Sequence, residues 1–483
     1  MEELAPSAYH DPREVVWKHL VAQAYWDILD RMQRDGIALG DFDAVRYAFL
    51  RSFDGHHDIE LLCRQAEASA SALVAKLEER GHPQAAASVA GVIAGARESL
   101  RRVMEGLQSL RQVDRLQSYV ADGVIRIAGK PAEEFAANPD FIGACLELVG
   151  EAAPEIAARA RAAWRRGFVV DDESIGLVRK AARQGWCADD MLAEVLMREQ
   201  TSGAYPSLRE YEFRTDRTPA DNHRAKARAI EEGCFLLGRL MSCAALLGEG
   251  SAPVDARALD LACPVAATLQ QAGIWLTPAR VDAARQFMLV RLSHGLNPGE
   301  FTARIASSVR TTFPQALAAS IIVRTGKMHG GAFTECMKQL EAYLAAPSRH
   351  EFVRGLVASG ELYGFGHRIH KRNPGSGGEL SGGDPRVAYQ IARARQACPE
   401  REDRIRAFEE LVRMVRTMKP TLAPNTDFGA AVWFHCLGLA PRVAAGIFTL
   451  SRVPGLIGQV INQLDYKANA LRPPLAVNLP YTV

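Results

Sequence analysis

Apolar residues recur every three or four positions along much of this chain, which is the periodicity of amphipathic helices. The longest such stripe consists of Val89, Val92, Ile93, Ala96, Leu100, Val103, Leu107 and Leu110. A second stripe, before a break at Gly81-His82-Pro83, consists of Ile59, Leu62, Ala66, Leu73, Val74 and Leu77. Residues 15–32 are a third candidate. The pattern predicts that residues 1–114 form a small antiparallel helical bundle, most simply a packing or oligomer-stabilising arm.

From about residue 115 to residue 328 the pattern predicts helix after helix, separated by polar loops such as residues 215–221. A chain of 483 residues is too long for one ordinary core, so we expect two or three domains. No run of about 18 apolar residues occurs, so we expect no membrane span. The fold class that these patterns favour is all-α.

Composition excludes several classes of function. The chain has 58 basic and 56 acidic side chains and 48% hydrophobic residues, the balance of an ordinary globular protein, so we expect no nucleic-acid partner. Nine cysteines are scattered singly without a C-x-x-C pair, which favours reduced thiols and a cytoplasmic location. The N-terminus has neither the basic nor the apolar region of an export signal. His56 and Glu60 have metal-compatible spacing but no second ligand cluster, so we predict no metal site.

Three glycine-punctuated stretches in the last third of the chain carry titratable side chains. They are residues 327–332 with His329, residues 364–368 with His367, and residues 424–428 with Asp427. Glycine lets a ligand approach the backbone closely, and two histidines with a carboxylate make an acid–base set. Each residue alone is more typical of a turn, a buried structural histidine or a helix cap.

In this order, the three stretches resemble the signature of the citrate synthase family. Further segments resemble it as well: Ser293-His294-Gly295-Leu296-Asn297, Phe301-Thr302-Ala303-Arg304, Asp384-Pro385-Arg386, Ser451-Arg452 and Arg472-Pro473. Residues 123–126 followed by 131–136 resemble the strand and first helix that open the family fold. The resemblance implies a helical two-domain protein: a large domain over residues 115–328, a small domain over 329–432 and a return to the large domain over 433–483.

The activity that the resemblance implies is a Claisen-type condensation of an acyl-CoA with a 2-oxo acid. Asp427 stands in the family position of the general base that removes a proton beside the thioester. His329 would hydrogen-bond the thioester oxygen, and His367 would polarise the ketone and protonate the new alkoxide. No cofactor is implied beyond the acyl-CoA substrate.

Substrate binding is implied for His294, Arg386, Arg452 and Arg472. Guanidinium groups suit bidentate binding of carboxylates, and we expect no carboxylate near these motif arginines, which favours a dianionic oxo acid such as oxaloacetate. The family's closing arginine reaches the partner subunit's site, so Arg472 implies a homodimer at least. Arg368 and Lys371 lie on the side where the family binds CoA, just before a glycine-rich insertion at residues 373–383.

The chain departs from the family pattern in ways that concern substrate choice. Phe333-Thr334 stands where the family has Asn-Glu, and Ser293 replaces an acidic residue. A 2-methylcitrate-type synthase, or a relative using another acyl group, therefore stays open. Two alternatives also stay open: cleavage of the bond by a citryl-CoA lyase-like protein, and a non-catalytic relative that binds a metabolite.

Overall fold

The computed structural model describes residues 71–91 near the N-terminus and the single positions 32, 68 and 94. It also describes residues 118–464, except for 122–123, 215, 249–254, 256, 296, 327–330, 368–369, 371–379 and 381–382. The chain divides into two compact units. The first contains Met1–Val113 and Arg472–Val483, and the second contains Asp114–Leu471.

The described part of the first unit is a helical hairpin. Residues 71–79 and 83–91 are helical, and they are joined at Gly81, whose φ of 81° is accessible to glycine at little cost. Leu77 and Val89 pack together in a small apolar cluster with Met32, Leu73, Ala85 and Ala86. The predicted break at residues 81–83 is confirmed. The rest of the predicted bundle, including most of residues 15–32 and the pair His56 and Glu60, lies outside the described residues.

The second unit opens with a three-stranded antiparallel sheet, in the order β1 (Tyr119–Ala121), β2 (Val124–Ile127) and β3 (Lys130–Pro131). Arg126 of β2 pairs with both Tyr119 and Pro131. The predicted opening strand and first helix are confirmed as β2 and α5.

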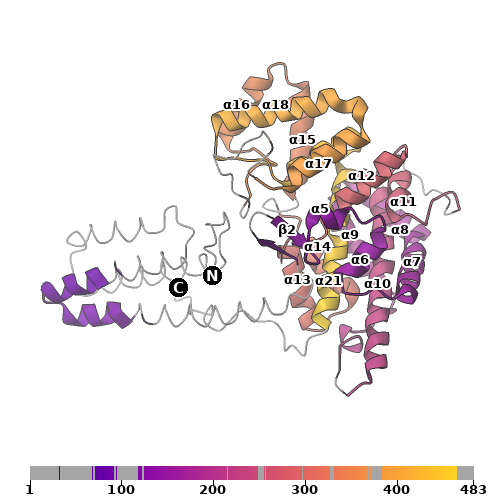
Figure 1. Ribbon diagram of the computed structural model, residues 1–483, viewed down its shortest axis with the longest axis horizontal. Coiled ribbons are helices and arrows are strands. Elements are labelled where there is room, and N and C mark those ends of the chain that lie inside the picture. The colour runs from indigo at the N-terminus through magenta and orange to yellow at the C-terminus, as the bar shows by residue number, and fades with distance from the viewer. Residues whose placement is uncertain are drawn as a thin grey trace. The chain divides into compact units, whose positions relative to one another are not determined.

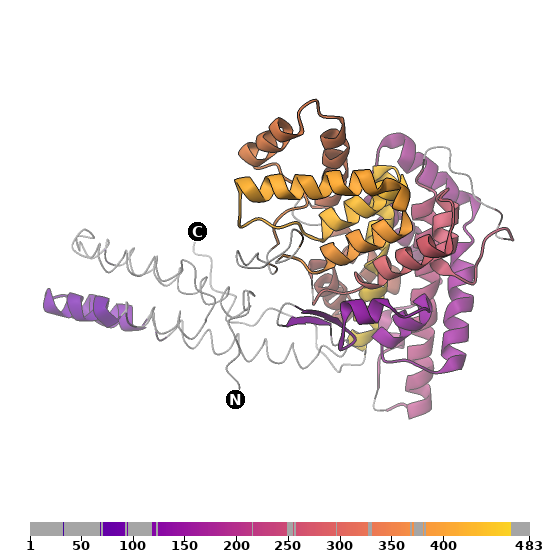
Figure 2. The same cartoon turned by 45° about the horizontal axis from the view of Figure 1, so that its top comes forward.

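The described remainder of the second unit is mainly helical, as predicted (Figure 1). Its first helices are α5 (Ala132–Ala136), α6 (Phe141–Leu148), α7 (Pro154–Phe168), α8 (Asp172–Gln184), α9 (Ala188–Thr201), the 3-10 helix η2 (Leu208–Glu210), α10 (Pro219–Ala245), α11 (Pro264–Gln271), α12 (Pro278–Leu289), α13 (Pro298–Ser308) and α14 (Phe313–Ile322). Then follow α15 (Gly331–Ala345), α16 (Arg349–Ser359), α17 (Arg386–Ala397), the 3-10 helix η3 (Pro399–Arg401), α18 (Glu402–Met418), α19 (Thr426–Leu437), α20 (Pro441–Leu450) and α21 (Val453–Leu464). In Figures 1 and 2, α15, α16, α17 and α18 gather on one side of this unit.

Local sequence explains where these helices begin. Proline lies in the first turn of α7, α10, α11, α12, α13, α14 and α20, where its missing N–H is not needed. Polar side chains accept hydrogen bonds from the first turn at Thr218 before α10, Asn297 before α13 and Asn425 before α19. The starts of these helices are therefore encoded within a few residues.

The core of the second unit includes a close contact between α7 and α10. A Cβ atom added at Gly167 would lie 1.9 Å from the carbonyl oxygen of Phe235, and one at Gly238 would lie 2.2 Å from that of Trp164. Only glycine permits this approach, which lets the two backbones touch.

One segment of the described chain, residues Pro441–Leu464 over α20 and α21, is long and apolar enough to cross a membrane, and 94% of its apolar window is buried inside the protein. Such burial is typical of core helices. These two helices carry Arg452 in the turn between them, and Arg452 is one of the predicted site residues.

Candidate active site

The turn before His367 lies against the segment that begins α19. The backbone N–H of Gly366 donates to the carbonyl of Ala423 at 2.8 Å, and that of Asn425 donates to the carbonyl of Gly364 at 2.9 Å. Gly364 has a φ of 80°, and a Cβ there would meet the Cys336 sulfur at 2.6 Å. Because these two segments pair, residues 60 positions apart in sequence approach the same site.

Asn425 fixes both segments with one side chain. Its Oδ1 accepts hydrogen bonds from the backbone N–H groups of Asp427 at 2.9 Å and Phe428 at 3.4 Å, which caps α19. Its Nδ2 donates to the carbonyl of Gly366 at 2.8 Å. The cap therefore orients the first turn of α19, which carries Asp427, relative to the turn that carries His367.

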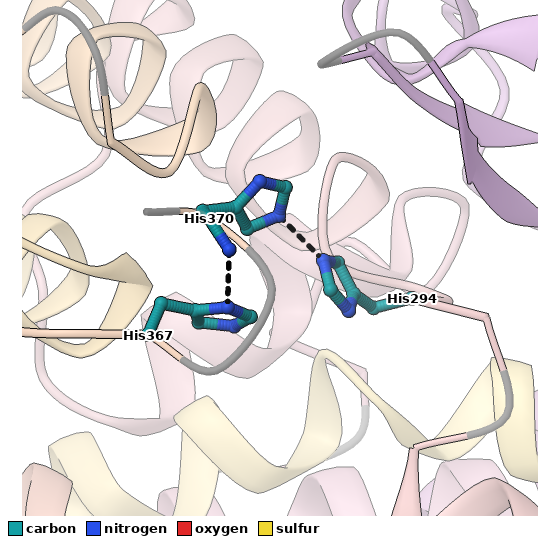
Figure 3. A group of neighbouring side chains, drawn as sticks. All are labelled: His294, His367 and His370. Carbon is teal, nitrogen blue, oxygen red and sulfur yellow. Dashed lines mark hydrogen bonds between the residues drawn. The ribbon is translucent and has the colours of Figure 1, made fainter. Parts of the chain in front are cut away.

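Three histidines converge beside this junction (Figure 3). The ring centroids of His294 and His367 are 5.3 Å apart, and that of His370 lies 5.1 Å from the first and 4.6 Å from the second. The Nε2 atoms of His294 and His370 are 2.8 Å apart, within hydrogen-bonding distance. The backbone N–H of His370 donates to Nδ1 of His367 at 3.1 Å.

These contacts define the neutral tautomer of His367. A nitrogen that accepts a hydrogen bond carries no proton, so in the neutral ring the proton is on Nε2. Burial lowers the pKa of His367 to about 3 and that of His370 to about 4; Arg386 adds to this fall, and Asp384 opposes it. Burial also lowers the pKa of His294 well below its usual value. His367 is therefore a neutral N–H donor at physiological pH.

The same three rings form the candidate metal-binding group among the described residues. A metal held at 2.0–2.1 Å by tetrahedrally arranged imidazoles separates the nitrogens by about 3.3 Å. The 2.8 Å contact between His294 and His370 is shorter, and Nδ1 of His367 is already engaged by a backbone N–H. A ring that binds a metal through Nε2 needs its proton on Nδ1, which is opposite to the tautomer in place. The arrangement fits hydrogen-bonded imidazoles better than metal ligands.

Asp427 lies in the first turn of α19, where no described residue hydrogen-bonds to its carboxylate. Burial raises the pKa of Asp427, and Arg291, followed by Arg324, Arg386 and Arg452, opposes that rise. A carboxylate held in this way is poorly solvated and keeps its oxygens available. These are the properties required of a base that attacks a weakly acidic C–H group.

The prediction that no carboxylate lies near the motif arginines is wrong for Arg386. Asp384 Oδ1 accepts from Arg386 Nε at 2.9 Å, and its Oδ2 accepts from Nη2 at 2.6 Å, in a fully buried pair. Burial alone would raise the pKa of Asp384, but Arg386 holds it well below its usual range. Asp384 Oδ2 also accepts from the backbone N–H of Thr426 at 3.2 Å, which joins the pair to α19.

The ion pair leaves part of Arg386 available. Its Nη1 is buried and has no hydrogen-bonding partner among the described residues. Arg452, also buried, donates from Nη1 to the backbone carbonyl of Arg291 at 2.6 Å, and no described carboxylate forms an ion pair with it. Burial, followed by Arg386 and Arg324, lowers the pKa of Arg452 to about 9. A buried, incompletely paired cationic region of this kind favours an anionic ligand.

The structure thus brings together five of the nine predicted site residues: His294, His367, Asp427, Arg386 and Arg452. The other four, His329, Arg368, Lys371 and Arg472, lie outside the described residues.

Sequence reasoning missed His370, Arg291 and the pairing of Asp384. The only signal for Arg291 was a single charge within the apolar run Phe287-Met288-Leu289-Val290 and Leu292. Asp384 was visible two residues before Arg386.

Residues 101–474 match the family described as citrate synthase, C-terminal domain. The chain belongs to the citrate synthase family. Among curated relatives, citrate synthase 2 of Bacillus subtilis (strain 168) is 27% identical over 192 residues, which are 39% of this chain and 49% of the relative. The 2-methylcitrate synthase 2 of Corynebacterium glutamicum is 26% identical over 201 residues, 41% of this chain and 49% of the relative.

The chain spans about half the length of these curated relatives in the matched regions. Solved structures are similar over longer stretches. The citrate synthase of Thermoplasma acidophilum, in a ternary complex with carboxymethyl coenzyme A and oxaloacetate, superposes with a TM-score of 0.57 and 18% identity, covering 73% of this chain and 89% of that chain. The citrate synthase of Thermotoga maritima gives a TM-score of 0.53 at 18% identity, covering 70% and 85%. These likenesses confirm the all-α fold.

Proposed function

We propose that this member of the citrate synthase family condenses an acyl-CoA with a dicarboxylic 2-oxo acid such as oxaloacetate, giving a citrate-like tricarboxylic acid and free CoA. The observation that supports this most directly is the junction of Asp427, a base with no hydrogen-bonding partner for its carboxylate among the described residues, with neutral His367 and the buried arginines Arg386 and Arg452. That combination provides a base, a proton donor and anion-binding groups in one place.

In the proposed reaction, Asp427 removes a proton from the carbon next to the thioester, and His329 hydrogen-bonds the thioester oxygen as an enolate forms. The enolate carbon attacks the ketone carbon of the oxo acid. His367, with its proton on Nε2, polarises that ketone and donates the proton to the new alkoxide. Water then cleaves the thioester and releases CoA.

Binding of the oxo acid is assigned to His294, Arg386, Arg452 and Arg472. Arg386 Nη1 has no partner within the described part of the chain, which supports this assignment, because a buried N–H without a partner is costly until a ligand accepts from it. Arg368 and Lys371 are proposed to bind CoA phosphates. No cofactor is proposed. The eight described cysteines are free, which supports the proposal of a reducing, cytoplasmic location.

Release of free thiol tests this function. Purified protein is incubated with oxaloacetate and acetyl-CoA, propionyl-CoA or longer acyl-CoAs, and CoA is measured with a thiol-reactive dye. Release that needs both substrates is the expected result. Asp427→Ala is expected to lower the rate by about a hundredfold to ten-thousandfold. Survival of activity in that variant would refute the mechanism, and cleavage of citryl-CoA without condensation would instead favour the lyase alternative.

We also propose a homodimer, supported by an apolar stripe on the surface. Phe301, Ile305 and Val309 recur every four residues along and just beyond α13, and Ile322 and Val323 lie at the end of α14. All five are exposed in the isolated chain. Because α13 and α14 pack against each other, these five side chains belong to neighbouring helices. Exposed apolar side chains on neighbouring helices are typical of a protein–protein interface. Ile305→Glu is expected to give a monomer in sedimentation analysis.

The proposed reach of Arg472 into the partner subunit is tested by mixing two inactive variants. A dimer of one Asp427→Asn protomer and one Arg472→Ala protomer contains one intact site if Arg472 acts across the interface. Random reassortment would then restore about a quarter of wild-type activity. Absence of any recovery, with mixed dimers verified by mass, would show that Arg472 acts within its own protomer.

A further inference from the structure

Arg291 is a buried guanidinium that the proposed chemistry has not used. It lies just after α12, three residues before His294, and is 1% exposed. No described carboxylate forms an ion pair with it. Burying a charge without a direct partner is unfavourable, so a residue of this kind has to be held and compensated by its surroundings.

The hydrogen bonds of Arg291 connect three segments at the site. Its Nε donates to Ser451 Oγ at 3.0 Å, in the turn between α20 and α21. Its Nη1 donates to the backbone carbonyl of Thr426 at 3.3 Å and also to the Thr426 hydroxyl. Thr426 immediately precedes Asp427. The Arg291 fork therefore holds the first residue of α19 against the segments that carry His294 and Arg452.

An aromatic stack fixes the plane of this guanidinium. The Cζ atom of Arg291 lies 3.8 Å from the ring centroid of Phe448, and the ring of Phe333 lies 4.1 Å from the same centroid with an interplanar angle of 10°. Two planar groups this close cannot share one face, so Phe448 lies between them. Phe333 stands where the family pattern has asparagine. Stacking of this kind orients a guanidinium without neutralising it.

The remaining charges around Arg291 single out Asp427. Arg452 and Arg386 disfavour its charged form, whereas Asp427 favours it. Asp384, a buried acid at the same site, is already paired with Arg386. Asp427 in turn has four arginines around it, and Arg291 is the one that opposes its protonation most strongly.

We propose that Arg291 is a positioning residue for the general base: its fork fixes the first turn of α19, and its stacked, unpaired charge is the counter-charge of Asp427. The kinetic test of this inference rests on the proposed function. A second test measures protein stability and does not depend on that function. The inference also gives a role to Phe333, which differs from the family pattern: Phe333 packs on the face of Phe448 opposite Arg291.

The kinetic test compares the pH dependence of kcat/KM for the acyl-CoA at saturating oxaloacetate. Arg291→Met removes the counter-charge, so the acid limb is expected to move to higher pH by about 1 to 3 units. Arg291→Lys keeps the positive charge but loses the forked hydrogen bonds to Ser451 and Thr426. The acid limb of its pH profile should therefore stay in place while kcat falls. Arg239→Met, at a buried arginine paired with Glu199, is the matched control and should leave the limb unchanged. If the acid limb of the pH profile lay at the same pH in all three variants and in the wild type, the proposal would be overturned.

A stability cycle tests the same coupling without turnover. Asp427→Asn removes a poorly solvated carboxylate and is expected to raise the Tm more in the Arg291→Met background than in the wild type, because only the wild type has the counter-charge. Additive Tm changes would overturn the proposal. If no substrate pair releases thiol, the proposed function fails, yet this cycle still decides whether Arg291 and Asp427 are coupled.

Discussion

Asp384 binds the guanidinium of Arg386 with both carboxylate oxygens, at 2.9 Å and 2.6 Å, and the pair is buried at the start of α17. It thereby orients Arg386 so that Nη1 is the nitrogen for which the described residues supply no partner. Pro385 between them has helical backbone angles, which turns the two side chains toward each other. The pair is therefore both a structural element and the support of a predicted substrate-binding residue.

Asp384→Asn is expected to destabilise the protein by about 3–5 kcal/mol, because it leaves a buried guanidinium without its counter-charge. Chemical denaturation measures this change. Glu400→Gln is the matched control: it breaks the exposed pair with Arg280 and should cost less than about 1 kcal/mol. Equal losses in the two variants would contradict the assignment of Asp384 as a buried partner. The KM for the oxo acid should rise only in Asp384→Asn.

Asn425→Ala is expected to lower stability by about 1–2 kcal/mol, through loss of the α19 cap, and to lower activity more than this loss explains. The reason is that Asn425 also holds the carbonyl of Gly366, one residue before His367. Thr218→Ala removes the cap of α10 and serves as the control with a similar stability loss. Activity that falls equally in both variants would show that Asn425 acts only as a cap.

The partly buried His367 and the buried His370 predict a loss of stability in acid. The pKa values of His367 and His370, about 3 and about 4, lie below the usual value of 6.5, so the folded protein prefers these rings neutral. Their contribution is fully present above pH 6.5 and is lost as the pH falls toward those values, by up to about 1.4 kcal/mol per pH unit for each ring. The Tm measured between pH 7 and pH 4 should fall, and His370→Gln should reduce the slope. An unchanged slope would contradict the burial of His370.

Gly238→Ala tests the contact between α7 and α10. The new Cβ would lie 2.2 Å from the carbonyl oxygen of Trp164, so the helices must separate, and a loss of about 1–3 kcal/mol is expected. Gly176→Ala, in α8, has no heavy atom within 4 Å of the new Cβ and should instead stabilise the protein by up to about 1 kcal/mol. Thermal unfolding of both variants measures the difference. A neutral Gly238→Ala would show that the two backbones are not in contact.

Local patterns in the sequence determined the helical class, because periodicity, first-turn prolines and N-capping side chains act within a few residues. The ordered motifs determined the family and named His294, His367, Asp427, Arg386 and Arg452, since each motif carries its own glycines or arginines. Asp384 could have been included, because its partner is only two residues away.

Tertiary structure alone decided the remaining contacts. Arg291 meets Thr426 across 135 residues, and Phe333 meets Phe448 through the packing of α15 against α20. The contact between His294 and His370 spans 76 residues and requires that a loop fold back onto the turn before α13. Such contacts depend on how separate helices pack, and no local pattern specifies that packing. The physical setting of Asp427, a partly buried carboxylate whose charged form four arginines favour, is therefore a property of the folded chain.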